Sequence, residues 1–143
     1  MPNLLRNILS AITGTLAGGF LNMSLINISG YIIPPPPGTD ATTVEGLQKS
    51  IHLFGPQHFI MPFLAHALGT LAGAFIATLL AQAAAGKRVS MVIGVLFLSG
   101  GVMAVRLIPA PMWFNVTDLV LAYLPMAWAG YYLANLTKAR FHG

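Results

Sequence analysis

Four long apolar stretches, almost free of charge, restrict this chain to the membrane. They cover residues 8–33, 57–85, 89–108 and 115–136. A bilayer core about 30 Å thick requires about 20 mostly apolar residues per helix, which each stretch supplies. Strands of a membrane barrel would alternate apolar and polar residues, and these stretches do not. We predict an all-α polytopic membrane protein, with residues 1–143 forming one four-helix transmembrane bundle.

The composition excludes the other broad classes. Only seven basic and three acidic residues occur among 143, whereas soluble globular chains are roughly one quarter charged. Disordered chains are charge-rich and poor in apolar residues. The chain has no cysteine, so it has no disulfide framework or cysteine-ligated metal. Its basic residues are scattered singly or in pairs, so we predict no nucleic-acid partner.

The connections between the stretches carry helix-breaking or polar residues. The segment 34–38 is Pro-Pro-Pro-Pro-Gly, and 109–111 is Pro-Ala-Pro; neither continues a helix. Gly86-Lys87-Arg88 is typical of a tight polar turn. Asn115, followed three residues later by Asp118, has the character of a helix cap.

The distribution of basic residues predicts the orientation. With four spans, Arg6, Lys87, Arg88, Lys138 and Arg140 fall on one side, and only Lys49 and Arg106 on the other. Basic residues accumulate on the cytoplasmic side. We therefore expect both ends of the chain, and the loop between the second and third spans, in the cytoplasm.

The first outer loop is expected to contain a short amphipathic helix. Thr42 and Glu45 have capping-box spacing, and an apolar stripe follows at helical intervals, formed by Val44, Leu47, Ile51 and Phe54. The helix is either a lid or partner surface, or an interfacial helix in the headgroups beside the second span. The second interpretation is favoured.

Small residues line the spans at helical spacing. Residues 14–20 and 69–75 have the same sequence except at one position, and each contains a Gly-x-x-x-Gly pair. Small residues allow helices to approach closely in lipid. We predict helix packing through Gly14, Gly18, Gly69, Gly73, Gly100 and Gly101, within one chain or between chains. Residues 16–19 also resemble 98–101, which leaves open a duplication of the first two spans.

Polar residues inside the spans have two interpretations. Asn22 and Asn27 lie in the first span and His66 in the second. They are predicted either to form hydrogen bonds between helices, which is favoured, or to line a solute path. A cofactor role for His66 is a third, less favoured alternative.

Arg106 and Asp118 are the remaining charges near the span interiors. The short connection between them predicts that both lie at the same outer depth, where an ion pair across the hairpin is the simplest account. The alternative is a mouth for a charged solute. The candidate polar path therefore comprises Asn22, Asn27, His66, Arg106 and Asp118.

Recognisable catalytic chemistry is missing from the sequence. It contains no phosphate-binding glycine loop, nucleophile elbow or His-Glu-x-x-His helix, and its three carboxylates are all expected on the outer side. Small multidrug exporters are similar in size and span count, but they depend on a glutamate in the first span, which this chain lacks. We predict no enzyme activity, no metal site and no cofactor.

Several segments resemble a group of small bacterial membrane proteins. They are residues 35–40, 64–77, 100–103 and 108–114, and they look like a widespread family of uncharacterised four-helix proteins. The resemblance implies a bacterial inner-membrane location and four helices, and it implies no activity. Where that group has an aromatic or aliphatic residue, this chain has His66, so the resemblance assigns His66 no role.

Two functions remain from the sequence. The first is a non-catalytic membrane protein whose glycine faces pack it into a homo-oligomer or a larger membrane complex, with lipid and other membrane subunits as partners. The alternative is a carrier or channel for small solutes or ions, acting as an oligomer.

Overall fold

The computed structural model describes residues 3–142 and is all-helical, with no strand in that range. The α-helices are α1 (Asn3–Ile32), α2 (Val44–Ser50), α3 (Ile60–Leu80), α4 (Gly86–Leu107), α5 (Met112–Leu121) and α6 (Leu124–His142). Short 3-10 helices are η1 (Ile51–Leu53), η2 (Pro56–Phe59) and η3 (Ala83–Ala85).

Four helical segments are long and apolar enough to cross a membrane. They are Asn3–Ile32, Pro56–Leu80, Ala83–Leu107 and Met112–Phe141. This confirms the predicted number of spans and a membrane-spanning helical bundle. The first segment begins earlier than expected, and the fourth extends further at both of its ends. The second ends at Leu80 and not at the predicted Ala85, and the third begins at Ala83 and not at the predicted Val89.

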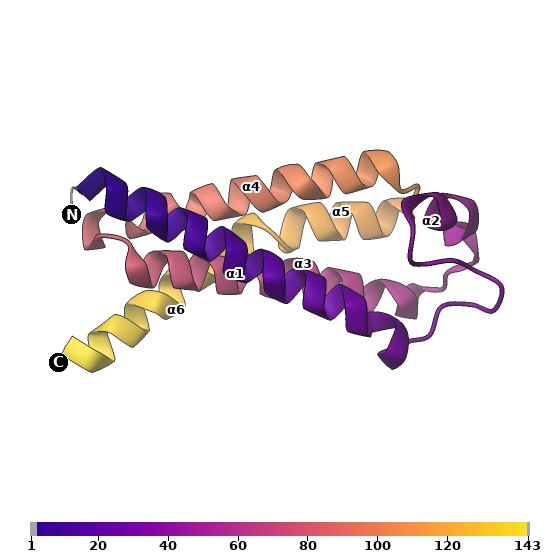
Figure 1. The fold of residues 1–143 in the computed structure, drawn as a ribbon, viewed down its shortest axis with the longest axis horizontal. Coiled ribbons are helices and arrows are strands. Elements are labelled where there is room, and N and C mark those ends of the chain that lie inside the picture. Colours follow the sequence, from indigo (N-terminus) through magenta and orange to yellow (C-terminus); the bar gives the residue numbers. More distant parts are fainter. Residues whose placement is uncertain (1–2, 143) are drawn as a thin grey trace.

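Helix α3 is the centre of the bundle. It packs against α1, α4 and α6, whereas α5 contacts α3, α4 and α6 less extensively. Figure 1 shows α1, α3, α4 and α5 running along the long axis, with α2 at one end and both labelled ends of the chain at the other. We call these the α2 end and the termini end.

The glycines of α1 and α3 form a direct backbone contact. A methyl group added at Gly14 or Gly18 would lie within 3.0 Å of the carbonyl oxygen of Gly73 or Gly69, respectively. The reciprocal additions at Gly69 and Gly73 would meet the carbonyl oxygens of Gly18 and Gly14, also within 3.0 Å. The two matching heptapeptides therefore pack against each other in antiparallel helices of one chain.

The fourth span is broken in its middle. Helix α5 ends at Leu121 and α6 begins at Leu124, and Figure 1 shows α6 diverging from the bundle axis after this break. Pro125 is the second residue of α6, where a missing N–H is tolerated, but it cannot continue α5 because its ring would clash with the preceding turn. The sequence prediction of one continuous helix over 115–136 is wrong for this reason.

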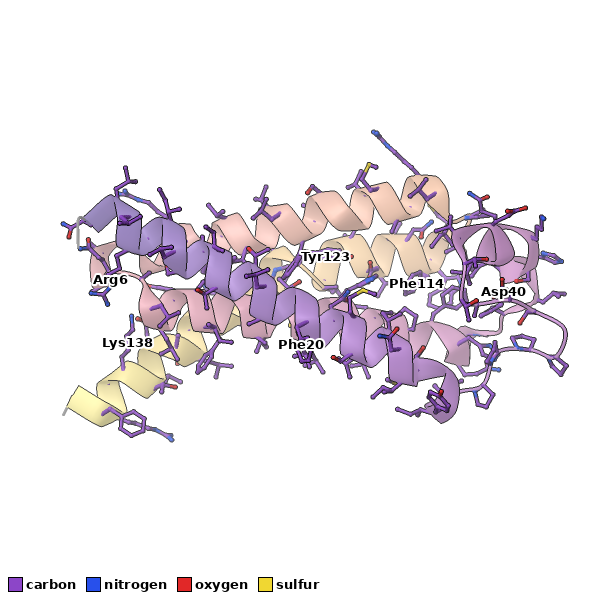
Figure 2. The ribbon with its side chains drawn as sticks, in the orientation of Figure 1. Arg6, Phe20, Asp40, Phe114, Tyr123 and Lys138 are labelled. Carbon is purple, nitrogen blue, oxygen red and sulfur yellow. The ribbon has the colours of Figure 1, made fainter. Side chains whose placement is uncertain are left out.

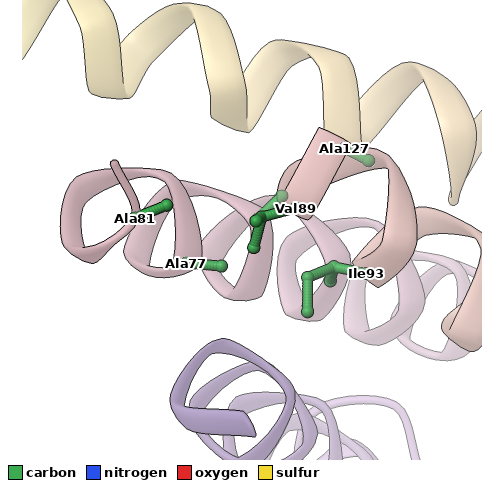
Figure 3. Packing of buried hydrophobic residues seen from close by; sticks show 6 residues of the cluster. Ala77, Ala81, Val89, Ile93 and Ala127 are labelled. Carbon is green, nitrogen blue, oxygen red and sulfur yellow. The ribbon is translucent and has the colours of Figure 1, made fainter. Parts of the chain in front are cut away.

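The termini end is filled by small apolar side chains. Ala74, Ala77, Ala81, Val89, Ile93 and Ala127 form one buried cluster, and Figure 3 shows it between α3, α4 and α6. Four of the six are alanine, so the helices approach closely here. This half of the bundle is therefore closed.

Polar groups at the termini end cap the last turn of α3. Arg6 donates to the carbonyl of Leu80 at 2.8 Å, and Lys138 donates to that of Thr78 at 2.7 Å. Asn7 accepts from the backbone N–H of Gln82 at 3.1 Å. Cationic donors satisfy the unpaired carbonyls of a helix C-terminus. Figure 2 places Arg6 and Lys138 at the opposite end from Asp40.

Three local predictions are wrong in detail. Gly86, Lys87 and Arg88 begin α4 instead of forming a turn, and the chain reverses over residues 81–85. Asn115 lies inside α5, whose N-cap is Pro111. Helix α2 is capped by Thr43, not Thr42, and its Oγ1 accepts from the N–H of Gly46.

The segment that contains α2 covers its end of the bundle. Ile51 is buried with Phe59 and Phe114, and Leu47 and Phe54 pack against them. Gln48 donates to the carbonyl of Leu107 at 2.6 Å, which fastens α2 to the end of α4. The apolar stripe thus faces the bundle, as the lid interpretation requires, although Val44 at its start is exposed.

Candidate functional site

A buried carboxylate lies inside the bundle. Asp118 of α5 is only 3% exposed. Nδ1 of His66 lies 2.8 and 2.9 Å from its two oxygens, and the hydroxyl of Tyr123 donates to one of them at 2.9 Å. The His66 and Tyr123 rings are stacked with centroids 5.8 Å apart. His66 of α3, Asp118 of α5 and Tyr123 of the turn between α5 and α6 therefore form one hydrogen-bonded group.

Helix geometry explains why His66 and Asp118 meet. Helix α3 begins at Ile60 and α5 at Met112, both at the α2 end. Each polar residue is therefore six positions into its helix, which corresponds to a depth of about 9 Å. The two helices run in the same direction and contact each other, so the side chains lie at the same level.

The break in the fourth span positions Tyr123. Residues 122 and 123 form the turn between α5 and α6, so the Tyr123 side chain is directed back toward Asp118 in the preceding turn. Tyr123 is 2% exposed, and Figure 2 shows it near the middle of the bundle. In a continuous helix it would be on a different face from Asp118, because five residues correspond to about 500° of rotation.

The predicted ion pair between Arg106 and Asp118 is wrong. Helix α5 begins three residues before Asn115, which places Asp118 in its second turn facing the interior. Arg106 is exposed and, within residues 3–142, forms no ion pair. The hydrogen-bond partners of the carboxylate are His66 and Tyr123, and the guanidinium does not contact it.

Two adjacent cavities meet at His66. The larger, of about 260 Å³, lies toward the α2 end of the bundle, and Asp118 and Asn115 are its polar residues on α5. The smaller, of about 220 Å³, is lined by Asn22, His66, Thr70, Phe97, Gly100, Gly101, Ala104 and Tyr123. His66, Gly101 and Ala104 line both. We call them the outer and the inner cavity.

The segment over the α2 end forms part of the outer cavity wall. Pro35, Leu47, Ile51 and Phe54 line it. His58 holds this segment in place, because its Nδ1 accepts from the N–H of Gly55 at 2.9 Å and its Nε2 lies 3.1 Å from the carbonyl oxygen of Pro34. Access to the outer cavity therefore depends on where this loop lies.

Asn22 has a buried amide oxygen that no side chain satisfies. Its Oδ1 is the single buried side-chain N or O atom without a hydrogen-bond partner among residues 3–142. A buried polar group left unpaired costs about 1–3 kcal/mol. Asn22 lines the inner cavity, but its Oδ1 has almost no accessible surface.

The candidate path residues separate into two groups. Asn22, His66 and Asp118 lie around the cavities, but Asn27 and Arg106 line neither and are exposed. The predicted path is therefore only partly assembled. Tyr123, which the sequence did not predict, lies with Asp118 and lines the inner cavity; Pro125 was the available signal, because a helix is expected to break before it.

The glycine candidates differ in their surroundings. Gly14, Gly18, Gly69 and Gly73 are occupied by the contact between α1 and α3. A methyl group at Gly101 would lie 2.5 Å from the Tyr123 hydroxyl, whereas one at Gly100 would meet nothing within 4 Å. The Tyr123 hydroxyl thus occupies the space that a side chain at residue 101 would need, whereas Gly100 borders open space.

The arrangement offers a buried pair of a carboxylate and an imidazole beside two cavities. No group of three or more His, Cys, Asp or Glu residues able to hold a metal ion occurs among residues 3–142. His66 and Asp118 are joined to each other by a short hydrogen bond. No residue set for a cofactor emerges beyond the two cavities.

Comparisons with known proteins found no match for the chain. No family model matches the chain, no curated protein matches it, and no solved structure is similar to it. The resemblance to small bacterial four-helix proteins therefore stays a prediction.

Proposed function

We propose that this protein is a carrier for a small solute, which binds in the two cavities at the His66–Asp118–Tyr123 group. The observation that carries the proposal is the buried carboxylate of Asp118 in the wall of a cavity within the membrane-spanning part. Ionisable residues inside spans are costly and commonly mark solute or proton paths. The path comprises Asn22, His66, Asp118 and Tyr123.

The closed termini end favours a carrier over an open channel. Both cavities lie between the α2 end and the middle of the bundle, and the alanine-rich cluster fills the remaining depth. A site accessible from one side at a time is the arrangement that alternating access needs. The broken fourth span, with Asp118 before its break and Tyr123 in it, supports the same mechanism.

The contacts between the glycines of α1 and α3 weaken the proposal that these glycines pack against a second chain. Four of the six predicted packing glycines are already buried between α1 and α3 of the same chain. They therefore explain how one chain folds, and they provide no free surface for a second. This is why the carrier becomes our first proposal and the packing subunit the second.

The proposed location is the bacterial inner membrane, with the termini end in the cytoplasm. Arg6, Lys138 and Arg140 belong to the termini end, and Lys87 and Arg88 begin α4 there. Positively charged residues are retained on the cytoplasmic side during insertion. The α2 segment then faces the periplasm, and the cavities are in an outward-facing state.

Uptake into proteoliposomes tests the carrier. Vesicles with the protein would be incubated with a mixture of amines, amino acids, sugars and carboxylates, and the retained solutes would be measured by mass spectrometry. We expect one chemical class to be enriched over empty vesicles, and Asp118→Asn to abolish the enrichment.

Glu45→Gln is the matched control. It also removes one carboxylate charge, but its side chain is 77% exposed and pairs only with Lys49, so uptake should remain at the wild-type level. Equal uptake by wild-type protein and Asp118→Asn, or no uptake of any class by wild-type protein, would rule out this carrier.

Assembly into a homo-oligomer or larger membrane complex is our second proposal. The observation that favours it is Asn27, an exposed amide in α1 beside the exposed apolar residues Met23 and Ile28. An amide facing lipid lacks hydrogen-bond partners, and a neighbouring helix would supply them. The mass of the protein in mild detergent tests this, and a strict monomer with no associated protein would contradict it.

A further inference from the structure

Two basic side chains from different helices meet at the C-terminal turn of α3. Arg6 of α1 donates to the carbonyl oxygen of Leu80 at 2.8 Å, and Lys138 of α6 donates to that of Thr78 at 2.7 Å. Figure 2 shows both side chains at the termini end. A guanidinium and an ammonium each carry more N–H groups than these bonds use, so both cations keep donors for a further partner.

The positive charge at this point has no acidic partner. The three acidic residues of the chain lie elsewhere, Asp40 and Glu45 at the α2 end and Asp118 inside the bundle. Within residues 3–142, neither Arg6 nor Lys138 forms an ion pair. The C-terminus of α3 contributes only about −0.5 of a charge, so about +1.5 remains. An anion from outside the chain would balance it.

Helices α1 and α6 lie on different sides of α3. Gly69 and Gly73 of α3 face α1, whereas Leu71 and Phe75 lie against Gly130 of α6. Both helices pack against α3, but they make little contact with each other. A side of α3 between them is therefore left without a helix from the described part of the chain.

That side of α3 is an apolar strip formed by Leu68, Ala72 and Leu79. Successive helical residues turn by about 100°, which places these three together, opposite Ala77 that is buried against α4. Leu68 is 41% exposed, and Ala72 and Leu79 are half-buried. We call this the α3 strip. It runs between α1 and α6 toward the end of α3 where the two cations lie.

A phospholipid has the same two parts in the same order, an anionic phosphate followed by apolar chains. Basic sites between membrane helices on the cytoplasmic side bind anionic headgroups. We infer that an anionic phospholipid binds at the termini end, with its phosphate between Arg6 and Lys138 and one acyl chain along the α3 strip. A headgroup that also carries a cation is disfavoured, because the remaining charge repels it.

This lipid site is separate from the proposed carrier site. The residues of the α3 strip line neither cavity, and Arg6 and Lys138 do not line them either. The inference therefore stands or falls independently of solute uptake.

Lipids with identical chains test the inference on the wild-type protein in an uncharged detergent. Dioleoylphosphatidylglycerol has the anionic phosphate and the chains, and dioleoylphosphatidylcholine adds a cation to the headgroup. Dioleoylglycerol lacks the phosphate, and glycerophosphoglycerol lacks the chains. Binding would be measured as the rise of the unfolding temperature with lipid concentration. We expect only dioleoylphosphatidylglycerol to raise it strongly.

Substitutions then locate the lipid. Arg6→Gln and Lys138→Gln are each expected to weaken dioleoylphosphatidylglycerol binding about fivefold, as counted by native mass spectrometry. Arg106→Gln is the matched control, because it removes an exposed cation at the end of α4 near the α2 end. Ala72→Phe should weaken binding by filling the α3 strip, whereas Val95→Phe, at an exposed position of α4, should not.

Three results would overturn the inference. Equal stabilisation by dioleoylphosphatidylcholine or dioleoylglycerol would show that the anionic headgroup is not recognised. Equal stabilisation by glycerophosphoglycerol would show a site for a free phosphate ester, without a role for the chains. Unchanged lipid binding in both Arg6→Gln and Lys138→Gln would place the lipid elsewhere. Because the lipid series requires no variant, the inference can fail even where a variant does not fold.

Discussion

The position of the buried Asp118 carboxylate depends on close packing between single residues of different helices. Gly101 faces the Tyr123 hydroxyl so closely that no side chain fits between them. The Tyr123 hydroxyl in turn reaches Asp118, which His66 contacts from α3. The geometry of the carboxylate is therefore controlled from α4, a helix that contributes no donor to it.

The substitution Gly101→Ala is expected to displace the Tyr123 hydroxyl and break its hydrogen bond to Asp118. Hydrogen bonds to charged groups contribute about 1.5–3 kcal/mol, so the free energy of unfolding should fall by that order. Unfolding of the detergent-solubilised protein by a denaturing detergent would measure it. Gly100→Ala is the control, because nothing lies within 4 Å of its added methyl. Equal losses in both variants would show that Gly101 has no special role.

The loop before α2 depends on one carboxylate outside the spans. Hydrogen bonds from the Thr42 hydroxyl and N–H, and from the Thr43 hydroxyl, lower the pKa of Asp40 to about 2. A carboxyl group whose pKa falls on folding stabilises the folded loop above its unfolded pKa of about 3.8. That contribution disappears as the pH falls toward 2.

Thr42→Val should raise the pKa of Asp40 toward 3.8, because it removes the hydrogen bond that lowers this pKa most. An NMR titration of the Asp40 carboxyl carbon would measure the pKa. Thr39→Val is the control, since the Thr39 hydroxyl donates to Pro36 and not to Asp40. A pKa of about 2 in both variants would contradict the assignment.

At the scale of helices, the contact between α1 and α3 is made by backbones. Gly14 and Gly18 of α1 lie against the carbonyl oxygens of Gly73 and Gly69. In lipid there is little hydrophobic force between helices, so close van der Waals approach is what holds them. Added methyl groups at this contact must push the helices apart.

Gly14→Ala is therefore expected to destabilise the bundle by about 1–3 kcal/mol, the usual cost of overpacking. Gly19→Ala lies on the same helix but meets nothing within 4 Å, so it should be neutral or gain up to about 1 kcal/mol from helix propensity. Denaturing-detergent titration of both variants gives the comparison. A Gly14→Ala protein as stable as Gly19→Ala would exclude the backbone contact.

The sequence predicted the elements better than it predicted the site. Length and hydropathy determine a span, so the four spans could be read from the order of residues. The pairing of His66 with Asp118 joins positions 52 residues apart, and it depends on where α5 begins and on which helices are neighbours. Both side chains lie six residues after the first residue of their helices, which predicts that they are at the same level. This correspondence was hidden because α5 was expected to begin at Asn115.

For the whole molecule, the topology has a direct test because the chain lacks cysteine. Lys87→Cys at the termini end and Glu45→Cys at the α2 end each introduce one exposed thiol. In intact cells, a reagent that cannot cross membranes should label Glu45→Cys alone. Both should be labelled after permeabilisation, which is the control. Labelling of Lys87→Cys from outside would reverse the proposed orientation.

The glycine seam between α1 and α3 also bears on how the molecule moves. Side chains also lie in this seam, because the Cβ atoms of Ala77 and Asn22 lie against Gly14 and Gly69. With the bond from Arg6 to the carbonyl of Leu80, these contacts fix the position of α1 along α3. Asn22 lies on α1 just beyond this seam, beside Gly69. The wall of the inner cavity that contains Asn22 and His66 is therefore rigid across these two helices, and any change in the shape of that cavity has to come from α4 or the broken fourth span.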